Sequence, residues 1–598
     1  MAEASDDLPI LSPDEIAQLF PDATPDPEPQ TFELGLVLGG TASAGCYTAG
    51  VLDFLVEALD AWHLAQATSP RTTPPHHFRL EIVSGDSGGA VCATLLSRVL
   101  QFDVPHLTAA SPRNTPGNPL YDLWVTGFSI EGLTGTGDLP APPGQHLASA
   151  LDSSFIDAMG DKVATFIGRD PAPGQRRYVS NPLRVTMPLA NLRGVPYLTS
   201  LTGVPLSSAA DGPGQGIYFV DHSDFAQFAV AQPQGRAARR GLRPDEFAVP
   251  AATSELTDPW RNYAEYAKGS AAFPGGLRTR DLHRPRAHYR YRVTVQPDQD
   301  GKAKVKALQP AWARMVDPAD DGRTDYAFAV ADGGSFDNAP IDLAHTWLAG
   351  MIARNPRNAK EANRAVLLVD PLAAGPTFGP AKSEGLLRTI GPFVYGEIIG
   401  SRYLTGDMAL MCDESVFSRF MITPWRSVPG TPGTAVGASA ITSSGLSAFA
   451  GFMHEDLRWH DYMLGRANCA AFLKNELVLD AENPLFDGWG ALKNDARFRV
   501  VDPKTKAAYL PIIPLMPTLS AAMPAVPDWP KPKLATANLT TRFETRIRAV
   551  LAQAQKDELK LGWIGGAVAS LVERLGADGA ARSVVKEIEA YLAARNMA

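Results

Sequence analysis

The chain has 598 residues, 45% hydrophobic and 20% charged, which is the balance of a folded globular protein with material for several domains. Its net charge of −9 argues against general nucleic-acid binding and provides no overall attraction to anionic membranes. The N-terminus has no basic region followed by an apolar core, and no apolar run approaches the length of a membrane span. We expect a cytoplasmic protein with peripheral membrane contact at most, while secretion by a route without such a signal stays open.

Proline, glycine and charge patterns divide the chain into five segments. Residues 1–31 are an acidic, proline-rich arm, expected to be mostly extended with one short turn around Asp14–Phe20. We predict an α/β domain with a loop-rich insertion over 32–375, a mainly helical extension over 376–510, a proline-rich linker over 511–534 and amphipathic helices over 535–598. We interpret these last helices as a cap on the core; the alternative is an element that contacts a membrane.

The first predicted strand, Leu34–Leu38, runs into a glycine-rich loop over 39–45, and a helix follows over Cys46–Leu59. Such a loop can bind phosphate or stabilise an oxyanion through its backbone amides. Phosphate motifs do not fit, because Cys46-Tyr47 stands where a P-loop needs Lys followed by Ser or Thr. We predict an oxyanion loop that uses Gly39, Gly40 and Thr41; the alternative is a tight turn without a ligand.

The second predicted strand, Phe78–Val83, leads through Gly85-Asp86-Ser87-Gly88-Gly89 into a helix over Ala90–Leu100. Strand, Gly-x-Ser-x-Gly and helix is the sequence form of a nucleophile elbow, a tight turn that exposes the serine hydroxyl at the strand end. A Cβ at Gly85 or Gly89 would crowd the neighbouring strand and helix. An ordinary glycine-rich turn is the alternative for Ser87.

The same five residues resemble the nucleophile segment of chymotrypsin-like proteases. That fold is all-β, and its catalytic His and Asp precede the serine. Only His63, His76 and His77 precede Ser87 here, and the segment after Ser87 has helical character. The protease interpretation therefore fails.

Further strands are predicted over Leu183–Leu189, Val195–Leu201 and Ile217–Val220. They precede a basic stretch, 277–292, that interleaves two tyrosines with six arginines: Arg278, Arg280, Arg284, Arg286, Arg290 and Arg292. Most such runs are solvated faces. The alternative is a surface that docks the protein on anionic lipid, where each Arg contributes about 1 kcal/mol.

The strand predicted over Tyr326–Ala331 ends at Asp332-Gly333-Gly334, and Asn338-Ala339-Pro340 then precedes a helix over Ile341–Ile352. Asp-Gly is first of all a turn signal. At the end of a strand, in a chain with a serine elbow, it also places a carboxylate where backbone can approach. The strand predicted over Ala365–Val369 would complete the sheet, and a largely helical run follows over Leu386–Leu410.

In combination these motifs resemble the patatin-like phospholipase family over residues 34–350. The resemblance rests on the glycine-rich loop, the elbow at Ser87, Gly269-Ser270-Ala271-Ala272-Phe273-Pro274, and Asp332-Gly333-Gly334 with Asn338 and Pro340, in the family's order. The loop departs from the family's Gly-Gly-Gly-x-Arg/Lys-Gly, because Thr41 replaces the third glycine and no basic residue precedes Gly45. The long C-terminal part is similar to extensions on some bacterial members.

The resemblance implies a three-layer α/β domain with a mostly parallel central sheet, a long insertion and a C-terminal helical region. It also implies a calcium-independent lipid acyl hydrolase of the phospholipase A or lysophospholipase type, working through a Ser87–Asp332 dyad and an acyl-enzyme. Gly85, Gly89, Gly333 and Gly334 would support the two catalytic residues. We expect a lipid or acyl-ester substrate, no cofactor, no metal and no nucleic acid; the oligomeric state is open.

Two other functions stay open. One is an α/β-hydrolase-type esterase with a Ser-Asp-His triad, because His345, His454 and His460 follow Asp332 in the order of that fold. The other is a catalytically weak lipid-binding scaffold, suggested by the missing basic residue in the loop. The His, Asp and Glu residues within 454–461 could bind a metal, but packing of an interdomain helix is the more common meaning of such a cluster.

Overall fold

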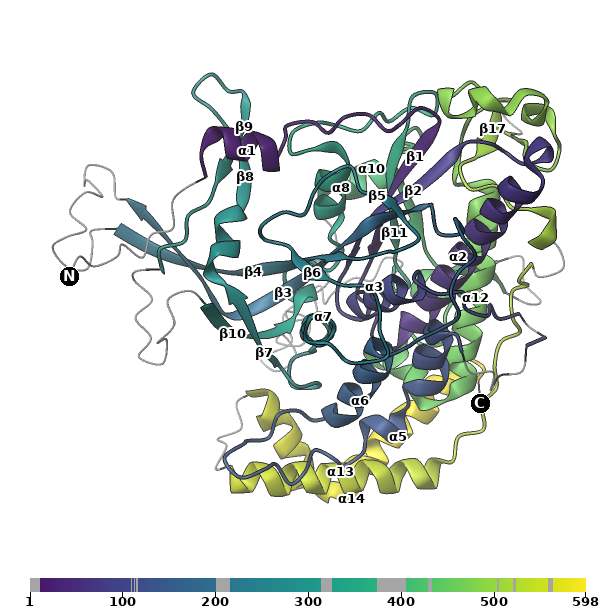
Figure 1. The fold of residues 1–598 in the computed structure, drawn as a ribbon. Coiled ribbons are helices and arrows are strands. Elements are labelled where there is room, and N and C mark those ends of the chain that lie inside the picture. The colour runs from purple at the N-terminus through teal and green to yellow at the C-terminus, as the bar shows by residue number, and fades with distance from the viewer. Residues whose placement is uncertain are drawn as a thin grey trace.

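A central β-sheet with strand order β12-β11-β1-β2-β3-β10-β7 organises the computed structural model (Figure 1). Its strands are β1 (Thr31–Leu38), β2 (His77–Gly85), β3 (Val179–Ser200), β7 (Arg280–Pro285), β10 (Asp325–Asp332), β11 (Arg364–Val369) and β12 (Arg419–Ile422). All pairings from β12 to β3 are parallel, and those of β10 with β3 and β7 are antiparallel. The predicted α/β class with a largely parallel sheet is confirmed.

The structure describes residues 11–597 except 109, 112, 114–116, 201–215, 313–324, 374–404, 429–432, 503–504, 520–522 and 558–562. Its longer helices are α2 (Gly45–Thr68), α3 (Gly88–Val99), α6 (Ser153–Ala164), α7 (Asp258–Ser270), α8 (Ile341–Ala349), α12 (Glu455–Asn475), α13 (Thr536–Lys556) and α14 (Trp563–Ala594). The short helices are α1 (Pro13–Leu19), α4 (Pro119–Tyr121), α5 (Ile130–Leu133), α10 (Thr405–Met411) and α11 (Gly445–Ala448). The remaining strands are β4 (Gly216–Val230), β5 (Arg236–Ala237), β6 (Phe247–Val249), β8 (Val293–Pro297), β9 (Ala303–Ala307), β13 (Trp425–Ser427), β14 (Thr434–Val436), β15 (Val478–Asp480), β16 (Val500–Val501) and β17 (Ala508–Pro511).

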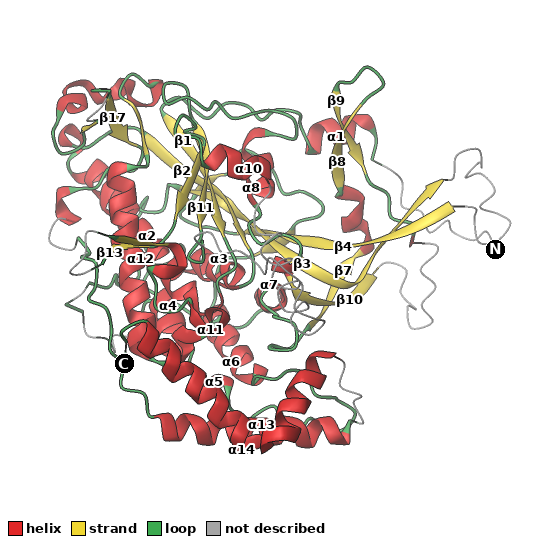
Figure 2. Cartoon of the chain, turned by 180° about the vertical axis from the view of Figure 1, so that it is seen from behind, coloured by secondary structure: helices red, strands yellow, loops and turns green. Residues whose placement is uncertain are grey.

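Helices cover both faces of the sheet, so the domain has three layers (Figures 1 and 2). Leu34, Leu36 and Leu38 of β1 point into the main core, which α2, α3 and α12 complete. Val37 points to the opposite face, where it packs with α8 in a smaller core. Because side chains alternate along a strand, a strand covered on both faces must be apolar on both. This explains the unbroken apolar run by which β1 is recognised in the sequence.

The strands predicted over 183–189 and 195–201 are parts of one strand, β3. It pairs with β4 on both sides of a bulge between Ala190 and Val195. Asn191 stabilises the bulge, because its side-chain oxygen accepts hydrogen bonds from the amides of Arg193 (3.1 Å) and Gly194 (2.8 Å). The polar residues that suggested a break between two strands therefore mark a bulge inside one.

Residues beyond 375 build the same fold rather than a separate helical unit. β12 extends the central sheet by pairing with β11, and β15, β16 and β17 form a small sheet of their own. The predicted boundary at 375/376 does not separate two folding units, and the described part of 376–510 is mixed rather than mainly helical. Of the helix predicted over Leu386–Leu410, α10 begins at Thr405; residues 386–404 lie outside the described ranges.

The close crossing of α2 and α12 attaches the extension to the main domain. A Cβ on Gly50 would lie 1.9 Å from the backbone oxygen of Tyr462, and one on Gly465 would lie 2.2 Å from that of Tyr47. Beside this crossing, fully buried Asp53 of α2 forms an ion pair with Arg466 of α12. Among the described helices only α2 is long and apolar enough to cross a membrane, but here it is the buried core helix.

The C-terminal helices lie against the loop-rich insertion. Arg546 of α13 is buried; it pairs with Asp138 and donates hydrogen bonds to the carbonyls of Ser149 (3.1 Å) and Ala150 (2.8 Å). These contacts are those of a helical cap. At the other end of the chain, α1 packs on the β8–β9 hairpin and supplies the short turn predicted around Asp14–Phe20; residues 1–10 of the arm lie outside the described ranges.

The helix crossing yields a prediction about stability. Alanine normally stabilises a helix by about 1 kcal/mol relative to glycine. We expect Gly50→Ala to destabilise instead, by roughly 1–3 kcal/mol, because its Cβ would push the two helix backbones apart. Urea unfolding would measure this, with Gly241→Ala as the control, since a Cβ there meets nothing within 4 Å. Equal stability of the two variants would contradict the tight crossing.

Candidate active site

Ser87 occupies a strained turn between the end of β2 and the start of α3. Its backbone has φ 52° and ψ −125°, a conformation that costs a non-glycine residue roughly 1–3 kcal/mol. A Cβ on Gly85 would lie 2.5 Å from the carbonyl oxygen of Gly89, and one on Gly89 would lie 2.1 Å from that of Leu38. The prediction that only glycine fits at these two positions is confirmed. The turn has the geometry of a nucleophile elbow.

The structure brings Ser87 together with Asp332, which lies 245 positions later in the chain. The Ser87 hydroxyl donates a hydrogen bond to Oδ2 of Asp332 at 2.7 Å. The other carboxylate oxygen accepts from the amide of Gly334 at 2.9 Å, and the Asp332 amide donates to the carbonyl of Ala272 at 3.0 Å. A Cβ on Gly333 would lie 2.3 Å from the Pro188 carbonyl, so glycine allows this close approach. The Asp-Gly-Gly segment thus places the carboxylate directly on the serine.

Asp332 has the properties of a base that works near neutral pH. Burial raises the pKa of its carboxyl to about 6, even though the hydrogen bonds from Ser87 and Gly334 lower this pKa. At pH 7 and above the group is ionised, yet it holds a proton more strongly than an exposed carboxylate does. A general base works best when its pKa lies close to the working pH.

A second carboxyl group, that of Asp86, lies beside the dyad, although no motif in the sequence predicts a role for it. The side chain of Asp86 is fully buried, and its Oδ2 has no hydrogen-bond partner among the described residues. Burial, together with the nearby carboxylates of Asp332 and Asp337, raises the pKa of Asp86 well above its usual range. The site therefore favours the neutral form of Asp86, which reduces repulsion of the charge on Asp332.

Ser270 connects Asp86 to the backbone of the elbow. Its hydroxyl accepts a hydrogen bond from the Ser87 amide at 3.2 Å and donates one to Oδ1 of Asp86 at 3.4 Å. Ser270 ends α7 and belongs to the segment 269–274 that contributes to the family resemblance. This segment therefore positions the elbow from the side.

The structure corrects the predicted oxyanion loop in two of its three residues. The amide of Gly39 donates to the Val369 carbonyl at 3.1 Å and that of Gly40 donates to the Asn338 carbonyl at 3.3 Å. Both amides are engaged because hydrogen bonding to neighbouring backbone continues past the end of β1. The amides of Thr41 and Gly88 have no hydrogen-bond partner among the described residues, and a Cβ on Gly88 would lie 2.0 Å from Thr41 Oγ1. Thr41 and Gly88 thus present the free donors next to Ser87.

The C-terminal extension holds this loop in place. The hydroxyl of Ser43 donates to the Ala448 carbonyl and accepts from the Gly451 amide at 3.1 Å. Asp461 of α12 anchors the same part of the extension, accepting hydrogen bonds from the amides of Thr442 (2.9 Å) and Ser443 (2.8 Å). The contacts of Ser43 join residues about 400 positions apart, so no local pattern could have predicted them.

Two exposed aromatic side chains belong to segments that contact or carry Asp332. Phe273 is 44% exposed and follows Ala272, whose carbonyl binds the Asp332 amide. Phe336 is 48% exposed and follows the Asp-Gly-Gly turn. The ring of Phe449, from the extension, lies 6.4 Å from that of Phe273. Apolar surface of this kind suits an apolar substrate.

Much of the charge of the basic stretch over 277–292 is paired within the protein. Arg284 is 2% exposed and, like Arg292, forms an ion pair with buried Asp224, while Arg280 pairs with Asp157. Tyr289 is also buried and donates to Asp224 at 2.6 Å. Alternate residues of β7 point into the protein, where these carboxylates neutralise them. Arg280, Arg284 and Arg292 therefore stabilise the protein's own structure, whereas Arg278 is exposed, and docking of this stretch on lipid stays a prediction.

The histidines do not complete a triad. All eleven lie in the described ranges, and none forms a hydrogen bond with Ser87 or Asp332. His454 caps α12 by accepting from the Asp456 amide at 3.1 Å, and His460 lies 2.7 Å from Asp461. Among the residues that the structure describes, no three His, Cys, Asp or Glu side chains are grouped to hold a metal ion. The residues within 454–461 instead pack α12 and anchor its neighbours.

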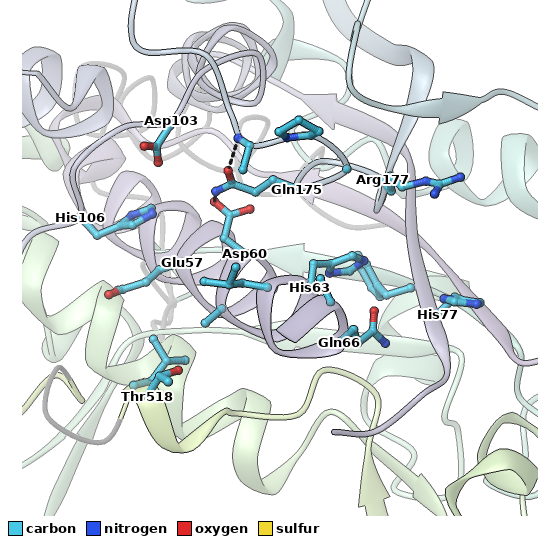
Figure 3. Close-up of a pocket in the computed structure, with 18 of the residues that line it drawn as sticks. Glu57, Asp60, His63, Gln66, His77, Asp103, His106, Gln175, Arg177 and Thr518 are labelled. Carbon is cyan, nitrogen blue, oxygen red and sulfur yellow. Dashed lines mark hydrogen bonds between the residues drawn. The ribbon is translucent and has the colours of Figure 1, made fainter. Parts of the chain in front are cut away.

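A cavity of about 930 Å³ lies at the opposite end of β2, where His77 begins the strand (Figure 3). The nine residues of β2 put it about 26 Å from the elbow. Asp60, on one wall, accepts hydrogen bonds from Gln175 at 3.0 Å and Tyr178 at 2.8 Å, and Glu57 pairs with Arg466. Asp60 and Glu57 already have partners within the protein, and the cavity is distant from Ser87. We therefore do not include it in the candidate active site.

Comparison with known proteins identifies one uncharacterized relative. No family model matches the chain. The uncharacterized protein y4iI of Sinorhizobium fredii is 31% identical over 574 residues, which cover 89% of this chain and 78% of that protein. Because this alignment is much longer than residues 34–350, the similarity includes most of the C-terminal extension.

The buried carboxylate of Asp332 yields a prediction about stability and pH. The pKa of Asp332 is about 6 in the folded chain and about 3.9 in the unfolded chain. Ionisation of this carboxyl therefore lowers the free energy of unfolding by about 3 kcal/mol. This loss is absent below pH 4, grows between pH 4 and 6 and is complete above. We expect Asp332→Asn to raise the melting temperature at pH 8 but not at pH 4, measured by calorimetry. A difference that does not change with pH would contradict this.

Proposed function

We propose that this chain, which belongs to the same family as the Sinorhizobium fredii protein y4iI, is a serine acyl hydrolase that cleaves lipid acyl esters. The observation that carries the proposal is the 2.7 Å hydrogen bond from Ser87, in its strained elbow, to Asp332. Strain of this kind persists where the surrounding structure enforces it, as at active sites. A buried carboxylate with a raised pKa on an activated hydroxyl suits acyl transfer.

The dyad accounts for both halves of the reaction. Ser87 Oγ attacks the ester carbonyl carbon while Asp332 takes its proton, and Asp332 then returns the proton to the leaving alcohol. The tetrahedral oxyanion accepts hydrogen bonds from the amides of Thr41 and Gly88, at the positive end of α3. Each such donor is typically worth about 10²–10³ in rate. Asp332 next removes a proton from water, which attacks the acyl-enzyme carbonyl carbon; when the Oγ–carbonyl bond breaks, Asp332 returns the proton to Ser87 Oγ and the acid is released.

Two features support a lipid ester over other acyl substrates. The exposed rings of Phe273 and Phe336 belong to the segments that contact or carry Asp332, and they provide apolar surface there. The elbow, the Asp-Gly-Gly turn and the Ser270 segment also occur together as the patatin-like phospholipase resemblance implies. The parallel strands β11, β1 and β2 with helices on both faces are compatible with that fold. We therefore propose a hydrolase of the phospholipase A or lysophospholipase type.

No observation favours the other two functions over this one. A triad needs a histidine that binds Ser87, and none does so. A scaffold without activity has no need for a serine and a carboxylate at hydrogen-bond distance in a strained turn.

Substitution of the dyad tests the proposal. Ser87→Ala and Asp332→Asn should each reduce hydrolysis of p-nitrophenyl decanoate and of a lysophospholipid by at least about 10³-fold, because nucleophile or base is lost. Ser84→Ala is the matched control on the same strand, since its buried hydroxyl has no hydrogen-bond partner among the described residues. His345→Ala should also stay active. Full activity of Ser87→Ala would end the proposal, and loss of activity in folded His345→Ala would favour a triad.

The pH dependence of the same reaction tests the role of Asp332. The base must be ionised, so log kcat/KM should rise with a slope of one up to about pH 6 and then level off. The profile is measured with the soluble ester at constant ionic strength. Asp332→Asn should lack this acidic limb in whatever activity remains. An identical limb in that variant would assign the titration to another group.

A further inference from the structure

A cavity of about 400 Å³ lies between the β3–β4 ribbon, α8 and the segment that follows α1. Its lining includes no residue of the elbow, the glycine-rich loop or the Asp332 turn. The walls combine polar and charged side chains with apolar ones, among them Phe20, Ile82, Tyr197, Phe225, Trp347 and Met351. In size and lining the cavity is within the range of small-molecule sites.

Four arginines line this cavity, and three of them are bound by carboxylates: Arg184 by Glu246, Arg243 by Asp245 and Arg292 by Asp224. The fourth, Arg240, has no ion pair and no hydrogen bond from its guanidinium to any described residue. Asp221 and Asp342 also line the cavity, and neither forms an ion pair with Arg240. Of these four arginines, Arg240 is therefore the one without a described carboxylate at ion-pair distance.

Arg240 is also partly removed from water. Its Nη2 atom is buried, and its guanidinium carbon lies 5.0 Å from the centre of the Trp347 ring, which Arg184 approaches to 4.8 Å. Burial, with the nearby Arg239 and Arg243, lowers the pKa of Arg240 to about 10, although the carboxylate of Glu81, which pairs with Arg79, opposes this shift. The group is still charged at pH 7, and a partly buried charge without a partner destabilises a fold. An anion in the cavity would remove this penalty.

We propose that the cavity binds a small amphipathic anion, with one carboxylate or phosphate head group on Arg240 and an apolar chain along the walls. A guanidinium donates two parallel hydrogen bonds to either head group. The side-chain oxygen of Gln227 also lines the cavity without a partner among the described residues, and its amide can rotate to present its NH₂ group to the same head group. The inference does not rest on the proposed activity, because binding requires no turnover.

Binding of three ten-carbon probes tests the proposal. Decanoate, decyl phosphate and neutral decanol are titrated into the full chain by calorimetry. We expect one or both anions to bind one to one, and decanol to bind at least tenfold more weakly. Preference for decanoate identifies a carboxylate ligand, and preference for decyl phosphate identifies a phosphate ligand. Failure of both anions to bind, or equal binding of decanol, would overturn the proposal.

Variants assign the binding to Arg240. Arg240→Gln should weaken anion binding at least tenfold, whereas Arg236→Gln should not. Arg236 is the matched control. It lies four residues before Arg240 in the chain, pairs with Glu28 and does not line this cavity. Without ligand, Arg240→Gln should melt at or above the wild-type temperature, since it removes an unpaired charge. A lower melting temperature would make Arg240 structural, and unchanged affinity would place the anion elsewhere; either result overturns the proposal.

Discussion

The candidate site depends on the contact of three backbone segments at the carboxyl ends of β1 and β2. Gly89 approaches the Leu38 carbonyl, and Gly85 approaches the carbonyl of Gly89, so closely that neither position admits a Cβ. This contact forces Ser87 into its unusual backbone conformation and directs its hydroxyl to Asp332. The surrounding structure must offset the conformational strain of this turn, because a strained backbone persists only where tertiary packing enforces it. The parallel sheet, covered on both faces, supplies that packing.

The balance of buried charge decides what chemistry this turn can perform. Two aspartates lie beside Ser87, and burial raises the pKa of both. Asp332 keeps hydrogen bonds from Ser87 and Gly334 that favour its ionised form, whereas one oxygen of Asp86 has no donor among the described residues. These surroundings favour the neutral form of Asp86 and the ionised form of Asp332, which is the form that the proposed base needs. Unequal environments of two acids thus distinguish a base from a structural group.

Buried ion pairs give the long chain much of its organisation. Burial opposes ionisation of Asp53, but Arg466 and His106 more than offset it and hold the pKa of Asp53 below its usual range. That ion pair joins the extension to the core helix α2. Asp224 likewise joins β4 to β7 through Arg284, and to the segment after β7 through Arg292. Removing one partner of such a pair leaves the other as an uncompensated buried charge, which is strongly destabilising. Each pair therefore holds its two segments together. Arg240, without a partner, departs from this pattern.

The sequence alone determined the local geometry: the apolar strands, the glycines of the elbow, and the turns that carry Ser87 and Asp332. Such features depend on backbone sterics and side-chain periodicity within a few residues, which a sequence displays directly. Only the tertiary structure decided which loop amides are free, because pairing with Val369 and Asn338 occupies those of Gly39 and Gly40. It also decided that Arg284 is buried against Asp224 and that β12 extends the sheet. These outcomes depend on partners distant in the chain, and a contact between distant residues leaves no periodic signal in either segment.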